Sequence, residues 1–251
     1  MTDPIIKLLE EAGRLAMASW RVPGVQVTDK SGGRHAPDLV SDADLEVNEF
    51  VTAGLSRLHG DVTLVSEEAE PMGSEPPADA FILDPIDGTH NYLGGSALWT
   101  IALARTRGHE VEEAWVHHPP TGETSHAKRG SPTTHDGVRV RVSLAPARRG
   151  LVSISLTRDL MPLLIHSGQF AGVRALGSHA FCLAATARGE FLLHAGGGKP
   201  WDIAAGFLLI ENAGGRVCDL EGNPRSPFDL NAQGLAGSPS AVQTALELMR
   251  S

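Results

Sequence analysis

The nine residues DPIDGTHNY, positions 84–92, follow directly on the apolar run AFIL at 80–83. Such a run predicts a buried strand, and two aspartates at its end are costly unless a positive group lies nearby. Pro85 holds Asp84 in an extended conformation, and the chain can then turn so that Asp87 points back beside it. Two carboxylates this close cannot both stay ionised without compensation. The stretch is therefore either an ordinary acidic turn or a cation site.

The rest of the string favours a cation together with an anion. A hard cation with oxygen ligands is the natural partner of two aspartates, and magnesium is the usual one where phosphate is also bound. Gly88 leaves room for a ligand to approach the backbone, and Thr89 supplies a hydroxyl. If a helix begins here, the amides of Gly88 and Thr89 could bind an anion. A lone D-x-x-D-G is most often a surface turn, whereas the whole string is more specific.

Length and composition predict a globular protein with a sizeable core. The chain has 251 residues, 41% of them hydrophobic and 20% charged, which is enough for one large domain or two packed halves. No apolar stretch is long enough to span a membrane, and the first 20 residues read as an amphipathic helix rather than a signal peptide. Cys182 and Cys218 form no disulfide framework, so we expect a reducing, cytoplasmic setting.

The charge pattern argues against a nucleic-acid polymer or a membrane as partner. The formal net charge is −9, and the most basic stretch, RVRVSLAPARR at 139–149, is interpreted as a solvated strand edge and turn. An acidic protein can still bind a small anion, but only where local positive charge reverses the sign of the field.

The pattern of apolar residues predicts mixed helices and strands. In the first half we expect helices at 2–20 and 42–59, the second stopped by Gly60, and strands at 62–66, 80–84, 97–105, 112–118, 123–128 and 138–143. In the second half we expect strands at 150–156 and 190–194, and helices at 158–167, 179–189 and from 200 onward. The last helix is apolar on nearly all faces and is predicted to lie between layers. The prediction is a layered α/β (α+β) fold with halves 1–145 and 146–251.

Three further acidic segments lie at strand ends or helix starts. They are SEEAE at 66–70, KPWDIAAG around Asp202, and DLVSDADLEVNEF with Asp38, Asp42 and Asp44. Each has a plain interpretation of its own: a solvated loop, an aspartate favoured at a helix start, and a capping residue. None is decisive when it is taken alone.

Taken together, the four segments resemble the motifs of the inositol monophosphatase family, the lithium-sensitive, magnesium-dependent phosphomonoesterases that share a fold with fructose-1,6-bisphosphatase. DLVSDAD is similar to the family's D-x-V-T-x-x-D, SEEAE to G-E-E-S, and DPIDGTHNY to D-P-[IL]-D-G-T-x-N-[FY]. PWDIAAGFLLIENAGG at 200–215 resembles W-D-x-A-A-G-x-x-[IL]-x-x-E-A-G-G. The motifs occur in the family's order and cover nearly the whole chain. The resemblance implies the α-β-α-β-α sandwich of the sugar phosphatases and a homodimer.

The resemblance also implies a role for each acid. The implied ligands of two magnesium ions all offer an oxygen, and Asp84 would bridge the ions: Glu67, Asp84, the carbonyl of Ile86, Asp87 and Asp202. Glu67 could also help a weaker third ion through waters. Asp44 and Thr89 would form the catalytic pair that positions and activates the attacking water. The phosphate would rest on the amides of Gly88 and Thr89, and hydrolysis would need no covalent intermediate.

Elementary electrostatics agrees with this ligand set. Four carboxylates and two magnesium ions give a neutral site before a phosphate dianion arrives. Without metal, each like-charge contact at about 4 Å would cost roughly 4 kcal/mol at an effective dielectric near 20. Metal ions would therefore explain how an acidic protein handles a small phosphorylated metabolite.

The substrate side departs from the family pattern. Inositol-selective members carry a glutamate seven residues before the W-D aspartate, and Ala195 stands there in this chain, which argues against an inositol phosphate as main substrate. Lys30 is the candidate for the lysine expected in the loop above the metals. Further candidates for substrate contacts are Arg174, Ser178, His179 and Lys199, although Ser178 could equally start a helix and Lys199 could be a loop charge.

Three functions remain open from the sequence. The first is a phosphatase for a small alcohol phosphate such as a sugar, inositol or histidinol phosphate. The second is a phosphatase for a bisphosphate, either fructose 1,6-bisphosphate or 3′-phosphoadenosine 5′-phosphate, which would need additional basic or aromatic residues. The third is a catalytically silent protein that binds metal or phosphate.

Overall fold

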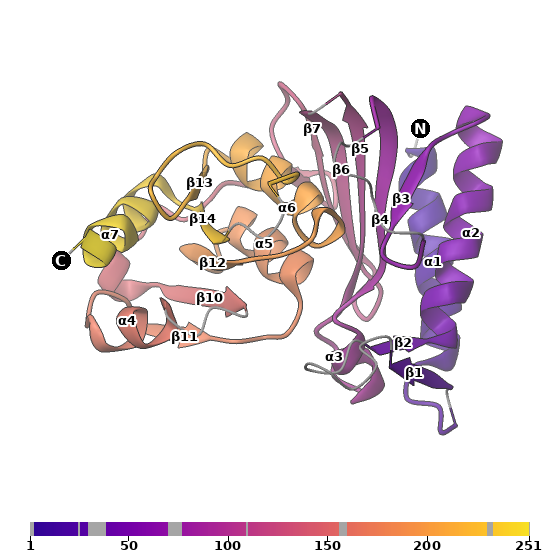
Figure 1. Cartoon of the computed structure of the whole chain (residues 1–251), viewed down its shortest axis with the longest axis horizontal. Coiled ribbons are helices and arrows are strands. Elements are labelled where there is room, and N and C mark those ends of the chain that lie inside the picture. The colour runs from indigo at the N-terminus through magenta and orange to yellow at the C-terminus, as the bar shows by residue number, and fades with distance from the viewer. Residues whose placement is uncertain are drawn as a thin grey trace.

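The computed structural model describes residues 3–24, 26–29, 39–69, 77–108, 110–155, 160–229 and 233–250. Lys30 and Asp38 lie outside the described residues. The chain forms five layers, in which helix pairs alternate with two sheets (Figure 1). The α-β-α-β-α arrangement predicted from the sequence is therefore confirmed. No helix within the described ranges has both the length and the apolar character needed to cross a membrane.

The larger sheet has seven strands and belongs to the first half of the chain. Its strands lie in sequence order: β3 (Leu64–Ser66), β4 (Asp79–Asp87), β5 (Thr100–Arg107), β6 (Glu110–His118), β7 (Glu123–Lys128), β8 (Thr134–His135) and β9 (Val138–Arg139). β3 and β4 are parallel, and the other neighbours are antiparallel. β4 is buried from Ala80 onward, because helices cover both faces of the sheet.

The smaller sheet has five strands and belongs to the second half. Its order is β11 (Gly172–Arg174), β10 (Leu151–Ser155), β12 (Leu193–Gly197), β14 (Gln233–Gly237) and β13 (Arg216–Asp219). β10 runs parallel to β11 and β12, whereas β14 is antiparallel to both of its neighbours. A two-stranded ribbon of β1 (Val27–Asp29) and β2 (Leu39–Ser41) precedes α2.

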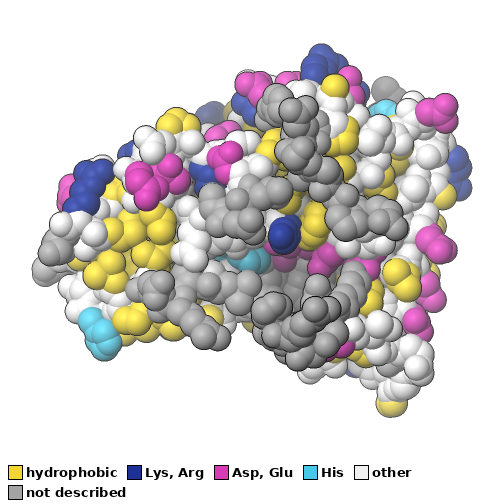
Figure 2. Space-filling model, viewed as in Figure 1, with side chains coloured by type: hydrophobic (Ala, Val, Ile, Leu, Met, Phe, Trp, Pro, Cys, Tyr) yellow, Lys and Arg dark blue, Asp and Glu magenta, His cyan; other side chains and the backbone are white. Residues whose placement is uncertain are grey.

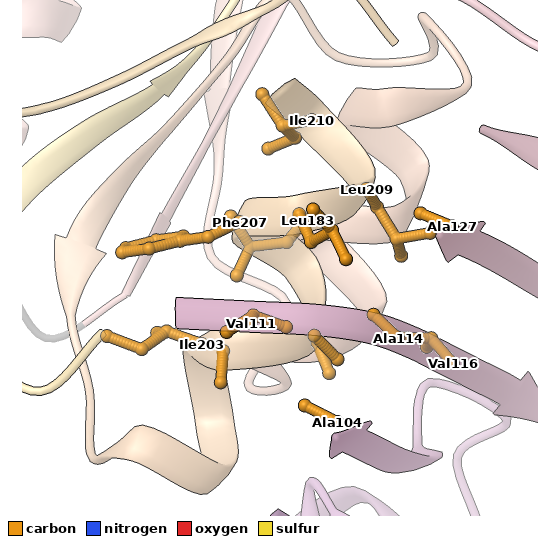
Figure 3. Packing of buried hydrophobic residues seen from close by; sticks show 14 of the residues in the cluster. Ala104, Val111, Ala114, Val116, Ala127, Leu183, Ile203, Phe207, Leu209 and Ile210 are labelled. Atoms are coloured by element: carbon orange, nitrogen blue, oxygen red, sulfur yellow. The ribbon is translucent and has the colours of Figure 1, made fainter. Parts of the chain in front are cut away.

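Three hydrophobic clusters bind these layers together. α1 (Pro4–Ser19) and α2 (Asp42–His59) pack on the outer face of the larger sheet, and α5 (His179–Ala187) and α6 (Pro200–Asn212) lie between the sheets. α4 (Leu160–His166) and α7 (Pro239–Arg250) cover the far face of the smaller sheet. Figure 3 shows Leu209 and Ile203 of α6 beside Ala127, Ala114 and Val111 of the larger sheet. This position explains why α6 is apolar on nearly all faces, as its sequence predicts.

The predicted elements of the first half agree best with the structure. α2 spans the predicted 42–59, and α1 begins and ends within two residues of the prediction. In the second half the strand predicted at 190–194 lies at Leu193–Gly197, and β11, β13, β14 and α7 were not predicted. The stretch 138–143 is a strand only at Val138–Arg139. The predicted boundary near residue 145 falls between the two sheets, and the division into domains stays a prediction.

Candidate active site

Three aspartates from distant parts of the chain meet where β4 ends and α6 begins. One carboxylate oxygen from each of Asp84, Asp87 and Asp202 lies within 4.8 Å of the others. Asp84 is 1% and Asp87 4% exposed. β4 continues through both residues, but its register with β5 shifts between them, after Pro85. This irregularity lets both side chains face the start of α6.

The negative charge of Asp84 is the least stabilised of the three carboxylates. Its Oδ1 is buried, and no described residue donates a hydrogen bond to it. Burial raises the pKa of Asp84 well above its usual value, and the charges of Glu67, Asp87 and Asp202 raise it further. An arrangement of this kind is costly in the absence of a cation.

Asp202 lies in the first turn of α6, where it both caps the helix and belongs to the acidic cluster. The amide of Lys199 donates to its Oδ2 at 2.6 Å, so the aspartate serves the helix start as the sequence predicts. A Cβ at Gly198 would lie 2.9 Å from the same oxygen, which explains the glycine. Burial raises the pKa of Asp202 to about 6, while His179 and Lys199 act in the opposite direction. Lys199 itself is exposed.

Asp87 holds the start of α5. Its carboxylate accepts hydrogen bonds from the amides of His179, Ala180 and Phe181 at 3.0, 2.9 and 3.3 Å. The Ser178 hydroxyl also donates to Asp87, and Ser178 Oγ accepts from the Phe181 amide as the helix cap. The sequence allows Ser178 to be either a substrate contact or a helix cap, and it does not indicate this link to Asp87. No local signal gives it, because the partners are about 90 positions apart.

Gly88 turns the chain from β4 into α3 (Thr89–Leu93). Its φ of +98° is in the left-handed region, and an added Cβ would lie 3.0 Å from the Leu98 carbonyl oxygen. Only glycine fits this position without strain. α3 starts at Thr89, so the helix start that the sequence made a condition for anion binding by the amides of Gly88 and Thr89 is present.

Asp44 and Thr89 join the first turns of α2 and α3. Asp44 is fully buried and accepts from the Ser41 amide at 2.8 Å and the Ser41 hydroxyl at 2.5 Å. Thr89 Oγ1 lies 3.4 Å from Asp44 Oδ1 and 3.2 Å from the carbonyl oxygen of Ile86. Burial raises the pKa of Asp44 to about 6, against the lowering effect of the Ser41 hydrogen bonds. The structure thus brings together the pair that the sequence predicted.

Glu67 lies beside the cluster. It follows β3, and its amide donates to the Leu83 carbonyl at 3.3 Å, which fixes the turn next to the end of β4. Its charge is the largest contribution to the raised pKa of Asp84 after burial. Glu67 does not belong to the group of three carboxylates whose oxygens lie within 4.8 Å of one another. A cation that Glu67 binds together with Asp84 would therefore occupy a different position from one held by the three aspartates.

Only some of the residues predicted to contact the substrate lie near the acidic cluster. His179 lies at the edge of the cluster, whereas Arg174 is exposed on the edge strand β11 and donates to the Val173 carbonyl. Ala195, which stands where inositol-selective members carry a glutamate, is 0% exposed and packs in the cluster under α4 and α7. Figure 2 shows acidic and histidine side chains side by side near the middle of one face of the molecule.

A divalent cation should stabilise this protein, and more strongly at neutral than at acid pH. The folded pKa values of Asp44 and Asp202 are about 6 against an ordinary 3.8, so the native state binds more protons than the unfolded state across that window. The free energy of unfolding of the metal-free protein therefore falls as pH rises from about 4 to about 6. Magnesium at 100 times its dissociation constant would add roughly 2.7 kcal/mol.

The check is the melting temperature in EDTA or magnesium chloride at about pH 5 and about pH 7.5, with potassium chloride matching the ionic strength. We expect a rise on adding magnesium that is clearly larger at the higher pH. An equal rise at both pH values, or none, would contradict this electrostatic description of the site.

Comparison with known proteins agrees with this geometry. The sequence model described as "Inositol monophosphatase family" matches residues 1–250. A Thermotoga maritima protein named fructose-1,6-bisphosphatase/inositol-1-monophosphatase is 31% identical over 236 residues, 91% of this chain and 88% of the relative. A Vibrio cholerae protein named Nus factor SuhB is 28% identical and covers 100% of this chain and 96% of its own length.

Solved structures share the fold. An inositol monophosphatase structure from Thermotoga maritima superposes with a TM-score of 0.86 at 28% identity, covering 98% of this chain and 95% of its own. An IMPase/NADP phosphatase complexed with Mg²⁺ and phosphate has a TM-score of 0.84 at 22% identity, over 98% and 94% of the two chains. With the family model matched along its length and a 31% identical relative, the chain belongs to the inositol monophosphatase family.

Proposed function

We propose that this protein is a magnesium-dependent phosphomonoesterase that hydrolyses a small alcohol or sugar phosphate. The observation that carries the proposal is the meeting of Asp84, Asp87 and Asp202 within 4.8 Å around a buried carboxylate oxygen to which no described residue donates. Family membership supports the reaction class. The IMPase/NADP phosphatase complexed with Mg²⁺ and phosphate supports the choice of ion.

The residues fit a hard divalent cation. Carboxylate oxygens are the donors that magnesium prefers, and no described lysine or arginine lies within ion-pair distance of the three aspartates. Asp84, Asp87 and Asp202 would hold one ion, and Glu67, Asp84 and the Ile86 carbonyl a second. Bound there, magnesium would supply positive charge to the phosphate and to the leaving oxygen and would lower the pKa of water. A weaker third ion near Glu67 is part of the same proposal.

The pair of Asp44 and Thr89 would position the attacking water. Thr89 Oγ1 has one proton, and two acceptors lie within reach: Asp44 Oδ1 and the carbonyl oxygen of Ile86. When that proton is donated to the Asp44 carboxylate, the lone pairs of Oγ1 are free to accept a hydrogen bond from water. A water held in this way could then pass its proton toward Asp44 as it attacks phosphorus.

Removing the Thr89 hydroxyl tests whether this group positions the attacking water or whether the side chain only fills space. We expect Thr89→Val, which keeps the branched shape, to lower kcat by roughly 10²-fold or more, whereas Thr89→Ser should retain most of it. Steady-state rates on para-nitrophenyl phosphate with magnesium give the comparison, and melting temperatures show whether both variants fold. Equal rates for the valine and serine variants would show that the hydroxyl has no part in the reaction.

A panel of phosphorylated compounds would identify the substrate directly. Purified protein with magnesium would be tested against para-nitrophenyl phosphate and a panel that includes sugar, inositol and histidinol monophosphates, fructose 1,6-bisphosphate and 3′-phosphoadenosine 5′-phosphate. Magnesium-dependent release of phosphate from a monophosphate supports the proposal. A preference for a bisphosphate, which the name of the Thermotoga relative favours as second candidate, would revise the substrate. No release from any compound would indicate a silent binding protein, the possibility raised by the Nus factor relative.

Further properties are proposed from family membership alone. They are inhibition by lithium, a homodimer and a cytoplasmic location. Rates with and without lithium chloride test the first, and light scattering of the purified protein tests the second.

A further inference from the structure

A cavity of about 530 Å³ lies where α1 and α3 end and β1 begins. No carboxylate of the acidic cluster lines it, and its volume is typical of a small-molecule site. Val22, Pro23, Val27 and Leu93 give it apolar walls, and Arg21 is the one charged residue among its described lining residues. Figure 1 shows α3 beside the ribbon of β1 and β2 that forms part of these walls.

Arg21 is held in a fixed position at this cavity. Its Nε donates to the Gly95 carbonyl at 2.9 Å, and its guanidinium carbon lies 4.0 Å from the centroid of the Trp20 ring. Its backbone φ of +63° is in the left-handed region, which is uncommon for a residue with a side chain. The chain therefore adopts an unfavourable backbone conformation at the residue whose guanidinium borders the cavity.

The unpartnered polar groups around the cavity are donors. No described residue accepts a hydrogen bond from the two NH₂ groups of Arg21. The indole N–H groups of Trp20 and Trp99 are buried and also lack a described acceptor. The carbonyl oxygen of Ala16 near the end of α1, in contrast, already accepts from the Trp20 amide and from the Tyr92 hydroxyl. A ligand with acceptor oxygens is therefore favoured over a cation.

The charge at this cavity is opposite in sign to that of the whole protein. The formal net charge is −9, yet no aspartate or glutamate is among the described residues that line the cavity. A guanidinium binds a carboxylate through two parallel N–H···O hydrogen bonds, and the NH₂ groups of Arg21 are available for them. One positive charge matches a carboxylate monoanion rather than a phosphate dianion. The apolar walls suit the hydrocarbon part of such a ligand.

We propose that this cavity is an effector site for a small carboxylate with an apolar body. The carboxylate binds the guanidinium of Arg21, and the apolar body lies against Val27 and Leu93. The site is separate from the acidic cluster, so that binding requires neither magnesium nor catalysis.

The walls of the cavity belong to the elements that carry the pair of Asp44 and Thr89. α3 begins at Thr89, and Leu93 at its end lines the cavity. Val27, another lining residue, is the register partner of Ser41, which donates to Asp44. Thr89 Oγ1 and Asp44 Oδ1 lie 3.4 Å apart, farther than in an ordinary O–H···O hydrogen bond. A ligand that shifts either wall should change this distance and with it kcat, a consequence that rests on the proposed function.

Binding is tested by titration calorimetry in EDTA with 4-phenylbutyrate as the probe. 4-Phenylbutyramide has the same body without the charge, and butyrate has the charge without the ring. We expect a dissociation constant below about 1 mM for 4-phenylbutyrate and roughly tenfold or weaker binding of the two matched compounds. No binding of 4-phenylbutyrate below about 10 mM, or equally tight binding of the amide, would overturn the proposal.

Variants locate the binding site. Arg21→Gln removes the charge and should weaken binding of 4-phenylbutyrate roughly tenfold or more. Val27→Asp places a negative charge at an exposed wall position, should weaken binding to a similar extent, and tests the site if Arg21→Gln does not fold. Arg14→Gln, an exposed arginine of α1 beside Glu11, is the matched control and should leave the dissociation constant unchanged. Unweakened binding in Arg21→Gln or Val27→Asp would overturn the proposal.

The effect on activity is measured separately with para-nitrophenyl phosphate and magnesium. We expect saturating 4-phenylbutyrate to change kcat of the unmodified protein by roughly twofold or more and to leave kcat of Arg21→Gln unchanged. Binding without a change in kcat would show that the effector role is wrong. A protein that binds 4-phenylbutyrate and hydrolyses no phosphate ester would contradict the proposed phosphatase function but would support the carboxylate site.

Discussion

Asp84→Asn should abolish measurable hydrolysis and at the same time stabilise the metal-free protein. The carboxylate of Asp84 is buried, and its Oδ1 receives no hydrogen bond from a described residue. Burial and the charges of four neighbouring carboxylates raise its pKa. The amide has nearly the same shape and no charge, so the repulsion disappears. Loss of a magnesium ligand removes several kcal/mol of transition-state stabilisation, and we expect kcat/KM to fall by roughly 10³-fold or more.

The stability effect is measured in EDTA. We expect the free energy of unfolding of Asp84→Asn to rise by on the order of 1–2 kcal/mol, or roughly 2–8 °C in melting temperature, and magnesium to add little to it. Asp79→Asn, an exposed aspartate at the other end of β4, is the matched control and should change neither quantity appreciably. A variant that is less stable than the parent in EDTA, or that keeps a full response to magnesium, would contradict the account.

Asp87→Asn should also abolish hydrolysis, but it should destabilise the protein. The carboxylate of Asp87 accepts three amide hydrogen bonds at the start of α5, where a negative charge is favoured, and a fourth from the Ser178 hydroxyl. An asparagine has one acceptor oxygen, and its NH₂ group would face donors. Hydrogen bonds to a charged group contribute about 1.5–3 kcal/mol, so we expect a loss of about that size in the free energy of unfolding.

Asp84→Asn and Asp87→Asn are therefore expected to change the free energy of unfolding in opposite directions, although both abolish hydrolysis. Urea unfolding in EDTA gives both free energies under one condition, and phosphate release from para-nitrophenyl phosphate gives both activities. Stabilisation by Asp87→Asn, or activity within tenfold of the parent in either variant, would show that the two aspartates do not have the roles assigned to them.

The sequence predicted the acidic segments well because each of them carries its own local signal. Asp84 and Asp87 follow an apolar strand, Gly88 marks a turn, and Asp202 begins an apolar helix. The helix α2 and the start of α6 agree with their capping and proline signals. The structure brings together the three aspartates and the pair of Asp44 and Thr89, as the resemblance implied.

What the sequence missed depends on contacts between distant residues. Four of the five amide and hydroxyl donors to Asp87 come from the start of α5, and no residue near Asp87 in the sequence indicates them. The side of β12 that faces the site was also missed, because the strand was predicted three residues early and a strand's facing depends on its register. β13 and β14 are short strands whose position depends on pairing beside β12 and on packing against α6. α7 is amphipathic along its length, so its sequence does carry a helical signal that the prediction left out.

The most direct test of the central claim is an anomalous diffraction experiment on crystals grown with manganese and phosphate. We expect at least one manganese peak bounded by carboxylate oxygens of Asp84, Asp87 and Asp202 at roughly 2.0–2.6 Å, with phosphate density beside Gly88 and Thr89. An absence of manganese between these three aspartates, at a concentration that supports hydrolysis in solution, would contradict it.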